Sequence, residues 1–312
     1  MDIREVDART ASDDVLLRFH ELELACHEEL QSGDPWRTRD EGIAFHRFLP
    51  ETITIGHWLA DGGVAVLWMH GPTATFCVVL VHPDRRRAGI GTALLERVVE
   101  RSRELGVETL RGDHGTAAGA AFAAHVGAVD EQRIVRSSLD LRAAELPEPR
   151  PPDGFRLVNW LGRVPDEHLG AYARARVAMD DAPAPEGMDY PVWDAAAIRA
   201  SEESLVRRGR EMRLTVAMDD AGEVGAFTEL RHSAGSVLGF TDDTGTVAAQ
   251  RGKGLARAVK FESLRRLRAD HPEIEVVTTR NAEENDVMRH LNESIGFRPT
   301  VVETTAALAV GS

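Results

Sequence analysis

Two short loops in this chain have the residue types that hold phosphate groups. The first, Arg86 to Gly91, reads R-x-x-G-x-G and lies between an apolar, β-branched stretch and an amphipathic helical pattern. Glycine lets the backbone approach an anion closely, and the first turn of a helix has unpaired N–H groups. The second loop, Arg251 to Ala256, reads R-x-x-G-x-A 165 positions later and also precedes a helical pattern. Two copies in matching contexts indicate two phosphate cradles.

With the residues before it, the first loop (VHPDRRRAGIG, residues 81–91) resembles motif A of the GCN5-related N-acetyltransferases (GNAT). The second half has further residues of this family's pattern: Asp243-Thr244 before the second loop, then 281–285 and 292–297. Residues 178–183 are similar to an entry segment of tandem bacterial members. The chain is therefore identified as a tandem two-domain bacterial member of this family. The resemblance implies an α/β fold with a mixed sheet in each half.

The resemblance implies that acetyl-CoA is the acyl donor and that the loops hold its pyrophosphate, mainly through backbone N–H groups, with arginines adding charge at the rim. The implied cofactor-binding residues of the first half are Leu80, Val81, Arg86, Arg87, Ala88, Gly89, Ile90, Gly91 and Thr92. Those of the second half are Arg251, Gly252, Lys253, Gly254, Leu255, Ala256, Asn281 and Asn285. By residue chemistry alone, each loop could instead be a tight turn with solvated arginines, and Asn285 could be a helix N-cap.

The sequence indicates the catalytic groups less clearly than the phosphate-binding loops. The resemblance places the proton donor for the departing thiolate, usually a tyrosine, at Ala123 in the first half and at Asn292 in the second. Neither residue can act as an acid at neutral pH. The resemblance also places a carboxylate base before the loop, where the second half has Asp243; strand alternation predicts that Asp242 points to the opposite face. We expect Asp243 and Asn292 to be catalytic if the second half is active, although Asp243 could also be a turn residue.

The expected function is transfer of an acetyl group from acetyl-CoA to a primary amine of a small molecule, by direct attack in a ternary complex. Cys26 and Cys77 have no Cys/His/Asp arrangement around them that would support an acyl-cysteine route. Among enzymes, the alternative is an acyltransferase acting on a protein amine. Because both halves lack the usual proton donor, a non-catalytic acyl-CoA sensor or sequestering protein is the alternative outside enzymes. Acceptor specificity is expected in segments 30–48 and 172–210, whose Trp36 and Trp193 could frame a cationic ligand or pack helices.

Composition excludes other classes. The chain has 312 residues, 43% of them hydrophobic and 28% charged, which suits two globular domains. A net charge of −14 argues against nucleic-acid and membrane binding, and it fits a cationic acceptor or simple solubility. The chain has no long apolar run, no secretory leader pattern and only two cysteines, so we expect a cytoplasmic monomer or homodimer.

The spacing of the histidines does not favour metal ligation, so no metal is expected. Individual histidines could act as bases, namely His57, His70, His82, His114 and His125.

The elements that would position these residues repeat once along the chain. A proline-rich segment, 147–154, is predicted to link a first domain (1–146) to a second (155–312), because such a run continues neither a helix nor a central strand. Each half is predicted to have an opening strand, helices, a meander of strands, the loop and its helix, another strand, a short helix and closing strands. This order indicates an α/β sheet with mixed pairing.

Overall fold

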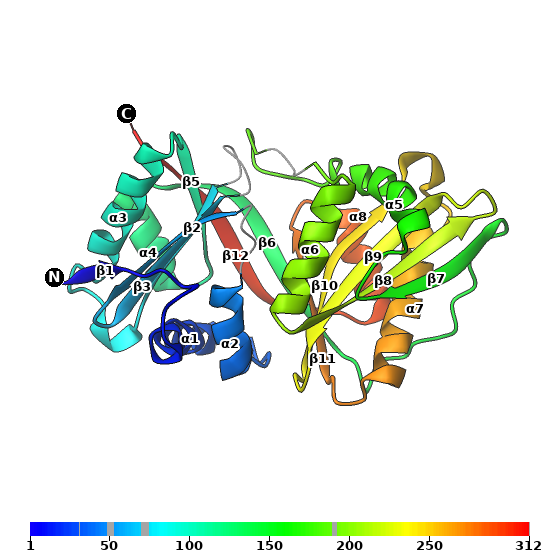
Figure 1. Ribbon diagram of the computed structural model, residues 1–312, viewed down its shortest axis with the longest axis horizontal. Helices are drawn as coiled ribbons and strands as arrows, with labels where there is room; N and C mark the ends of the chain where they lie inside the picture. Colours follow the sequence, from blue (N-terminus) through cyan, green and yellow to red (C-terminus); the bar gives the residue numbers. More distant parts are fainter. Residues whose placement is uncertain (31, 49–52, 70–74, 189–191, 312) are drawn as a thin grey trace. The chain divides into compact units, whose positions relative to one another are not determined.

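The computed structural model describes residues 1–30, 32–48, 53–69, 75–188 and 192–311, and the chain forms two compact units (Figure 1). Unit 1 consists of Met1–Val135, Ala184–Pro191 and Val301–Ser312, and unit 2 of Arg136–Pro183 and Val192–Thr300. These limits differ from the predicted domains 1–146 and 155–312, since the last twelve residues belong to unit 1. The difference arises from long-range strand pairing, which a local proline-rich pattern does not report.

Unit 1 contains a sheet with the strand order β1-β2-β3-β4-β5-β12. The parallel pair is β4–β5, and the final strand lies antiparallel to β5, with Thr304 opposite His114 and Ala309 opposite Thr109. The elements are β1 (Ile3–Glu5), α1 (Asp13–Glu29), α2 (Arg39–Arg47), β2 (Thr54–Ala60), β3 (Gly63–Met69), β4 (Thr75–Val81), α3 (Ile90–Glu104), β5 (Thr109–His114), α4 (Ala117–Val126), β6 (Val129–Asp140), which continues into unit 2, and β12 (Arg298–Ala309).

Charge and capping patterns in the sequence explain where the helices of unit 1 begin. The acidic first turn of α1 suits the helix dipole, and Thr38 and Glu41 form a capping box at the start of α2. The predicted apolar stripe of α3 is confirmed, because Ile90, Leu94 and Val98 are buried against the sheet.

Unit 2 contains the strand order β6-β11-β10-β9-β8-β7. Its elements are β7 (Phe155–Leu161), α5 (Leu169–Arg176), α6 (Ala195–Arg207), β8 (Arg210–Asp219), β9 (Val224–Ser233), β10 (Leu238–Thr246), α7 (Leu255–Asp270), β11 (Val276–Ala282) and α8 (Asp286–Ile295). Both units therefore have the predicted mixed α/β character. A bilayer-spanning helix needs about 20 apolar residues, and none of the helices in the described ranges has that length and character.

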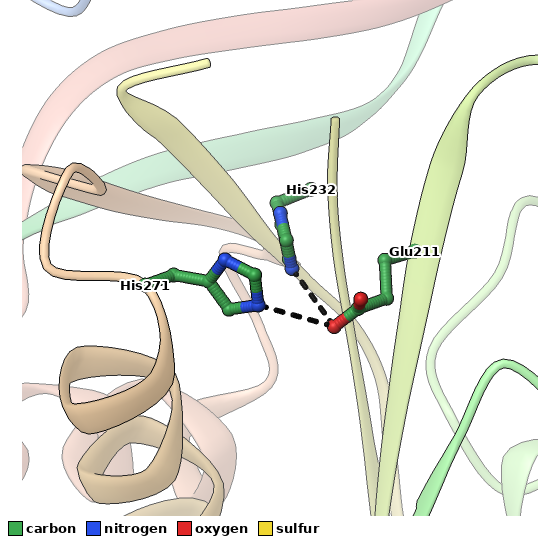
Figure 2. A group of neighbouring side chains, drawn as sticks. All are labelled: Glu211, His232 and His271. Atoms are coloured by element: carbon green, nitrogen blue, oxygen red, sulfur yellow. Dashed lines mark hydrogen bonds and ion pairs between the residues drawn. The ribbon is translucent and has the colours of Figure 1, made fainter. Parts of the chain in front are cut away.

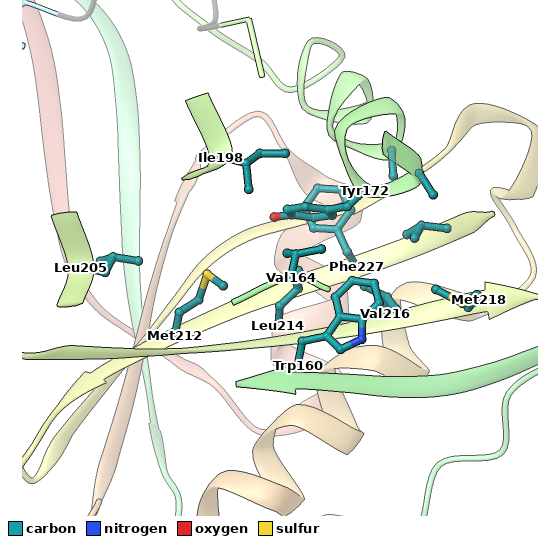
Figure 3. Packing of buried hydrophobic residues seen from close by; sticks show 13 residues of the cluster. Trp160, Val164, Tyr172, Ile198, Leu205, Met212, Leu214, Val216, Met218 and Phe227 are labelled. Carbon is teal, nitrogen blue, oxygen red and sulfur yellow. The ribbon is translucent and has the colours of Figure 1, made fainter. Parts of the chain in front are cut away.

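The two faces of the unit 2 sheet are covered by different helices. Alternation along β8 directs Leu214, Val216 and Met218 towards α5 and α6, where they pack with Tyr172 and Phe227 (Figure 3). The opposite face packs on α7, whose Leu255 and Val259 contact Ala217 and Ala226. The segment that leads into the second loop, β10, therefore has a helix-covered surface on each side.

Candidate functional site

The two loops have the same backbone conformation. After β4, His82 (φ −48°, ψ 133°) leads into a 3₁₀ turn at Pro83–Arg85; after β10, Val247 (φ −54°, ψ 134°) leads into a 3₁₀ turn at Ala248–Gln250. The turns end at Arg86 and Arg251, which have extended dihedrals of φ −70°, ψ 165° and φ −64°, ψ 156°. The second loop has Ala248 where the first has Pro83, and this difference does not change the course of the backbone.

The helices that follow begin in the same way. Arg87 (φ 64°) and Gly252 (φ 76°) both have left-handed dihedrals, and so do the N-cap residues Gly89 (φ 78°) and Gly254 (φ 79°). Neither N-cap residue offers a side-chain hydrogen bond to its helix. Apart from atoms of the adjacent residues, no atom of the described chain lies within 4 Å of the position that a Cβ would occupy on either glycine. The first N–H groups of α3 and α7 thus face an open position that suits an anion.

The loop arginines were expected to add positive charge at the rim of the phosphate site, but each one pairs with a carboxylate of the protein. The Arg86 guanidinium donates to both carboxylate oxygens of Glu29 at 2.6 Å, and its Nε donates to the carbonyl of Val81 at 3.2 Å. Arg251 repeats this arrangement with an ion pair to Asp181 and an Nε bond to the Thr246 carbonyl at 3.3 Å. Arg86 therefore fastens its loop to the last residue of α1, and Arg251 fastens its loop to the segment that follows α5. In both cases a carboxylate neutralises the charge of the arginine.

The parallel strands before the loops pair over only part of their length. In unit 2, β10 pairs with β11 from Leu238–Phe240 to Val276–Thr278, although both strands continue beyond these residues. In unit 1 the parallel pairing of β4 with β5 is at Phe76 and Arg111. The strand segments nearest each loop consequently have main-chain groups that do not bond to the neighbouring parallel strand.

A bulge in β10 overturns the prediction that Asp242 and Asp243 point to opposite faces. The register with β9 shifts between Thr241 and Thr244, so the period-two alternation is interrupted there. Asp243 forms an ion pair with Arg176, and Asp242 forms one with Arg231 at 2.6 Å. Both arginines also contact Glu229, at 3.2 and 2.6 Å, so the two aspartates belong to one network.

This network has a surplus of negative charge. Three carboxylates face two guanidinium groups, and burial together with the neighbouring Asp242 raises the pKa of Asp243 to about 6. Arg176 also donates to the Tyr172 hydroxyl at 2.9 Å and lies 3.8 Å from the centre of the Trp193 ring. Asp243 is thus a carboxylate whose pKa suits a general base near neutral pH.

The aromatic residues that were candidates for framing a cationic ligand contact cations of the protein itself. Trp193 lies over Arg176, as described above, and Arg37 lies 4.6 Å from the centre of the Trp36 ring. Trp36 also stacks on His27, with ring centres 4.3 Å apart. Both tryptophans therefore pack against side chains of the protein, which supports the packing role over the framing of a cationic ligand.

The three asparagines of unit 2 have different surroundings. Asn285 is the N-cap of α8 and accepts from the Met288 N–H at 3.2 Å, so the capping role is confirmed. Asn281 lies within β11 and accepts from Asn292 Nδ2 at 2.7 Å. The Oδ1 atom of Asn292 is buried, and no partner for it occurs among the described residues. Asn292 therefore offers one acceptor that could receive a hydrogen bond from a ligand.

The corresponding features of the first half differ. Ala123 lies on α4 and supplies no proton donor, as expected. Burial raises the pKa of Cys77 to about 12 and also raises that of Cys26, so both thiols are protonated at neutral pH and an acyl-cysteine route has no support. His57 is buried 3.2 Å from His46, and its burial lowers its pKa to about 3. His70 lies outside the described residues.

Sequence reasoning missed Arg176 and Glu229, which lie 53 positions apart and meet across α5 and β9. One local signal was present: Glu229 interrupts an apolar strand and is 3% exposed. Carboxylates are rarely so buried unless they are paired.

Comparisons with known proteins agree with this geometry. The sequence profile of the Acetyltransferase (GNAT) family matches residues 16–127. Mycothiol acetyltransferase from Mycobacterium ulcerans is 27% identical over 216 residues, which cover 64% of this chain and 61% of that protein. The chain thus matches less than two thirds of that relative's length. Mycothiol acetyltransferase from Saccharomonospora viridis is 35% identical over 98 residues, 31% of each chain.

Solved structures match over the whole chain. A tandem GNAT protein from the clavulanic acid biosynthesis pathway has a TM-score of 0.82 and 25% identity, covering 100% of this chain and 99% of that one. A GCN5-related N-acetyltransferase from Sphaerobacter thermophilus has a TM-score of 0.72 and 16% identity, covering 99% and 96%. The similarity to the tandem GNAT protein extends over both copies of the loop and its helix.

Proposed function

We propose that this chain, which belongs to the GCN5-related N-acetyltransferase (GNAT) superfamily and has its tandem architecture, transfers an acetyl group from acetyl-CoA to a primary amine of a small molecule. The observation that carries the proposal is the repeated loop conformation, with left-handed residues at the same two positions and an uncapped helix N-terminus in both copies. The name of the mycothiol acetyltransferase relatives favours a small-molecule acceptor over a protein amine.

The acyl donor would bind through its phosphates at a loop and through its extended arm beside the parallel strands. Backbone N–H groups of residues 87–92 or 252–257 are the donors for the pyrophosphate, because the loop arginines are already bonded to Glu29 and Asp181. The main-chain groups of β10 and β11 that do not pair with one another provide hydrogen bonds for an amide-containing arm.

We place the acetyl transfer in unit 2. The neutral amine attacks the thioester carbonyl, and the tetrahedral intermediate collapses by releasing the thiolate of CoA. Asp243 accepts the proton of the attacking amine, directly or through water, and Asn292 orients the thiol or a water that returns a proton to it. Asp243 suits this role because its pKa of about 6 leaves it mostly ionised at neutral pH, yet able to hold a proton transiently.

A non-catalytic role in acyl-CoA binding is the second candidate. It is favoured by two observations: the positions expected for a tyrosine hold Ala123 and Asn292, and Asp243 already has an ion pair with Arg176. Such a protein would bind acetyl-CoA without turning it over.

Turnover of acetyl-CoA by the full chain against a panel of small amines separates the two candidates. We expect Asp243→Asn to lower turnover at least tenfold, about 1.4 kcal/mol in barrier, with acetyl-CoA affinity nearly unchanged. In the wild type the rate should rise with pH through about 6, since the ionised carboxylate is the base. Binding without turnover for every amine would favour the sensor, and normal turnover by the variant would exclude Asp243 as the base.

The same assay identifies the loop that serves catalysis. Gly89→Val and Gly254→Val are a matched pair, because each places a β-branched residue at a left-handed N-cap. If unit 2 is catalytic, only the second variant should abolish turnover. Loss of turnover in the first variant alone would move the catalytic role to unit 1.

A further inference from the structure

Three side chains from separate elements meet at one end of unit 2. Glu211 lies near the start of β8, His232 near the end of β9, and His271 directly after α7 (Figure 2). The second loop lies at the other end of α7, whose 16 residues give a length of about 24 Å. The cluster is therefore separated from the second loop by the length of α7. None of its three residues pairs with Asp242 or Asp243, so it needs a separate explanation.

The side chains point towards one another with a spacing that fits a metal ion. Glu211 Oε1 lies 3.2 Å from His232 Nε2 and 3.3 Å from His271 Nε2. The three candidate ligand atoms all lie within 4.8 Å of one another. Tetrahedral zinc with bonds of about 2.0–2.1 Å has ligand atoms about 3.4 Å apart, so the two oxygen–nitrogen separations already match its edges.

The surroundings orient these groups as ligands. His271 Nδ1 lies 3.1 Å from a carboxylate oxygen of Glu273, which is the carboxylate–histidine contact that commonly supports a zinc-bound imidazole. His232 is 3% exposed, so the packing around it restricts the orientation of its imidazole.

We propose that Glu211, His232 and His271 form a binding site for a divalent transition-metal ion, with zinc as the ion that the ligand set and spacing fit. Two imidazoles and a carboxylate are ligands that zinc accepts, and water would complete the tetrahedron. The ion joins the C-terminal end of α7 to β8 and β9. It would therefore hold the helix of the second loop against its sheet, and its effect should be on the stability of unit 2.

Calorimetry with zinc chloride on the full chain, after dialysis against a chelator, tests this site. The wild type should bind one zinc ion per chain at this site, and zinc should raise its melting temperature. His271→Ala should weaken binding at least 100-fold, and Glu273→Gln by about 10–100-fold with unchanged stoichiometry. His290→Ala is the matched control, because His290 is exposed on α8 of the same unit, and it should bind zinc like the wild type.

Substituting the buried His232 could impair folding, so Glu211→Gln, which keeps the size of a side chain that is 38% exposed, serves as the second variant. Cobalt(II) gives an independent readout, because a tetrahedral site produces intense visible absorption. The wild type should develop this absorption, and Glu211→Gln should not. Zinc affinity in His271→Ala equal to that of the wild type, or no zinc binding by the wild type, would show that the three residues form only an ion pair network.

Discussion

Replacing the buried Lys260 with methionine should stabilise unit 2. Lys260 lies on α7, is 2% exposed, and has its Nζ atom 3.4 Å from the Thr244 hydroxyl and 5.8 Å from the centre of the Phe297 ring. Burial lowers the pKa of its ammonium group from 10.5 to about 7. Methionine has a similar length and needs no hydration, so it fits the same space without the cost of burying a charge.

The expected magnitude follows from this change in pKa. Between pH 7 and 10.5 the unfolded chain holds a proton on Lys260 that the folded chain mostly lacks, so stability falls as the pH is lowered through this range. At 1.36 kcal/mol per unit, the lysine costs about 4 kcal/mol at pH 7 and about 2 kcal/mol at pH 9. Allowing for the lost contact with Thr244, we expect Lys260→Met to gain about 2–4 kcal/mol at pH 7 and about half as much at pH 9.

Thermal unfolding at the two pH values measures the effect. A unit of this size gains about 2–4 °C per kcal/mol, so its transition should move up by about 4–16 °C at pH 7. The matched control is Lys253→Met, which changes the chain's only other lysine, an exposed residue that bonds Gln250. The control should change stability by less than about 0.5 kcal/mol. An unchanged transition in Lys260→Met, or a gain that does not shrink at pH 9, would refute the reasoning.

Three other substitutions test the burial of His57 in unit 1 and the shared conformation of the two loops. Because burial, with the nearby His46, lowers the pKa of His57 to about 3, the folded chain cannot take up the proton that the unfolded chain takes up below about pH 6.5. The wild type should therefore lose about 2 kcal/mol of unit 1 stability between pH 8 and pH 5, and melting curves of His57→Gln should show a clearly smaller loss. In the loops, Arg87→Gly should stabilise unit 1 by up to about 1 kcal/mol and Gly252→Ala should destabilise unit 2 by about 1 kcal/mol, because both positions have left-handed dihedrals. Denaturation in which both changes have the same sign would show that the two loops do not share a backbone conformation.

Local patterns predicted the elements well, and they failed where residues far apart in sequence meet. The stripe on α3 and the cap at Asn285 depend on neighbours within a few positions, and both could be predicted from the sequence. Whether Asp242 and Asp243 share a network depends on a bulge relative to β9, which strand alternation does not reveal. The network around Arg176 and the cluster around Glu211 assemble from several elements. No spacing in the sequence points to them, and the absence of a metal was expected for that reason.

The pairing of β12 with β5 has a consequence for synthesis of the chain. Thr304 pairs with His114, so roughly 190 residues must be translated after β5 before its partner strand exists. At about 5–20 residues per second this interval lasts on the order of 10–40 s. Throughout it, β5 lacks its final neighbour, and an unpaired strand edge is a template for mispairing. Completion of the unit 1 sheet is thus delayed until β12 has left the ribosome, after all of unit 2 has been translated.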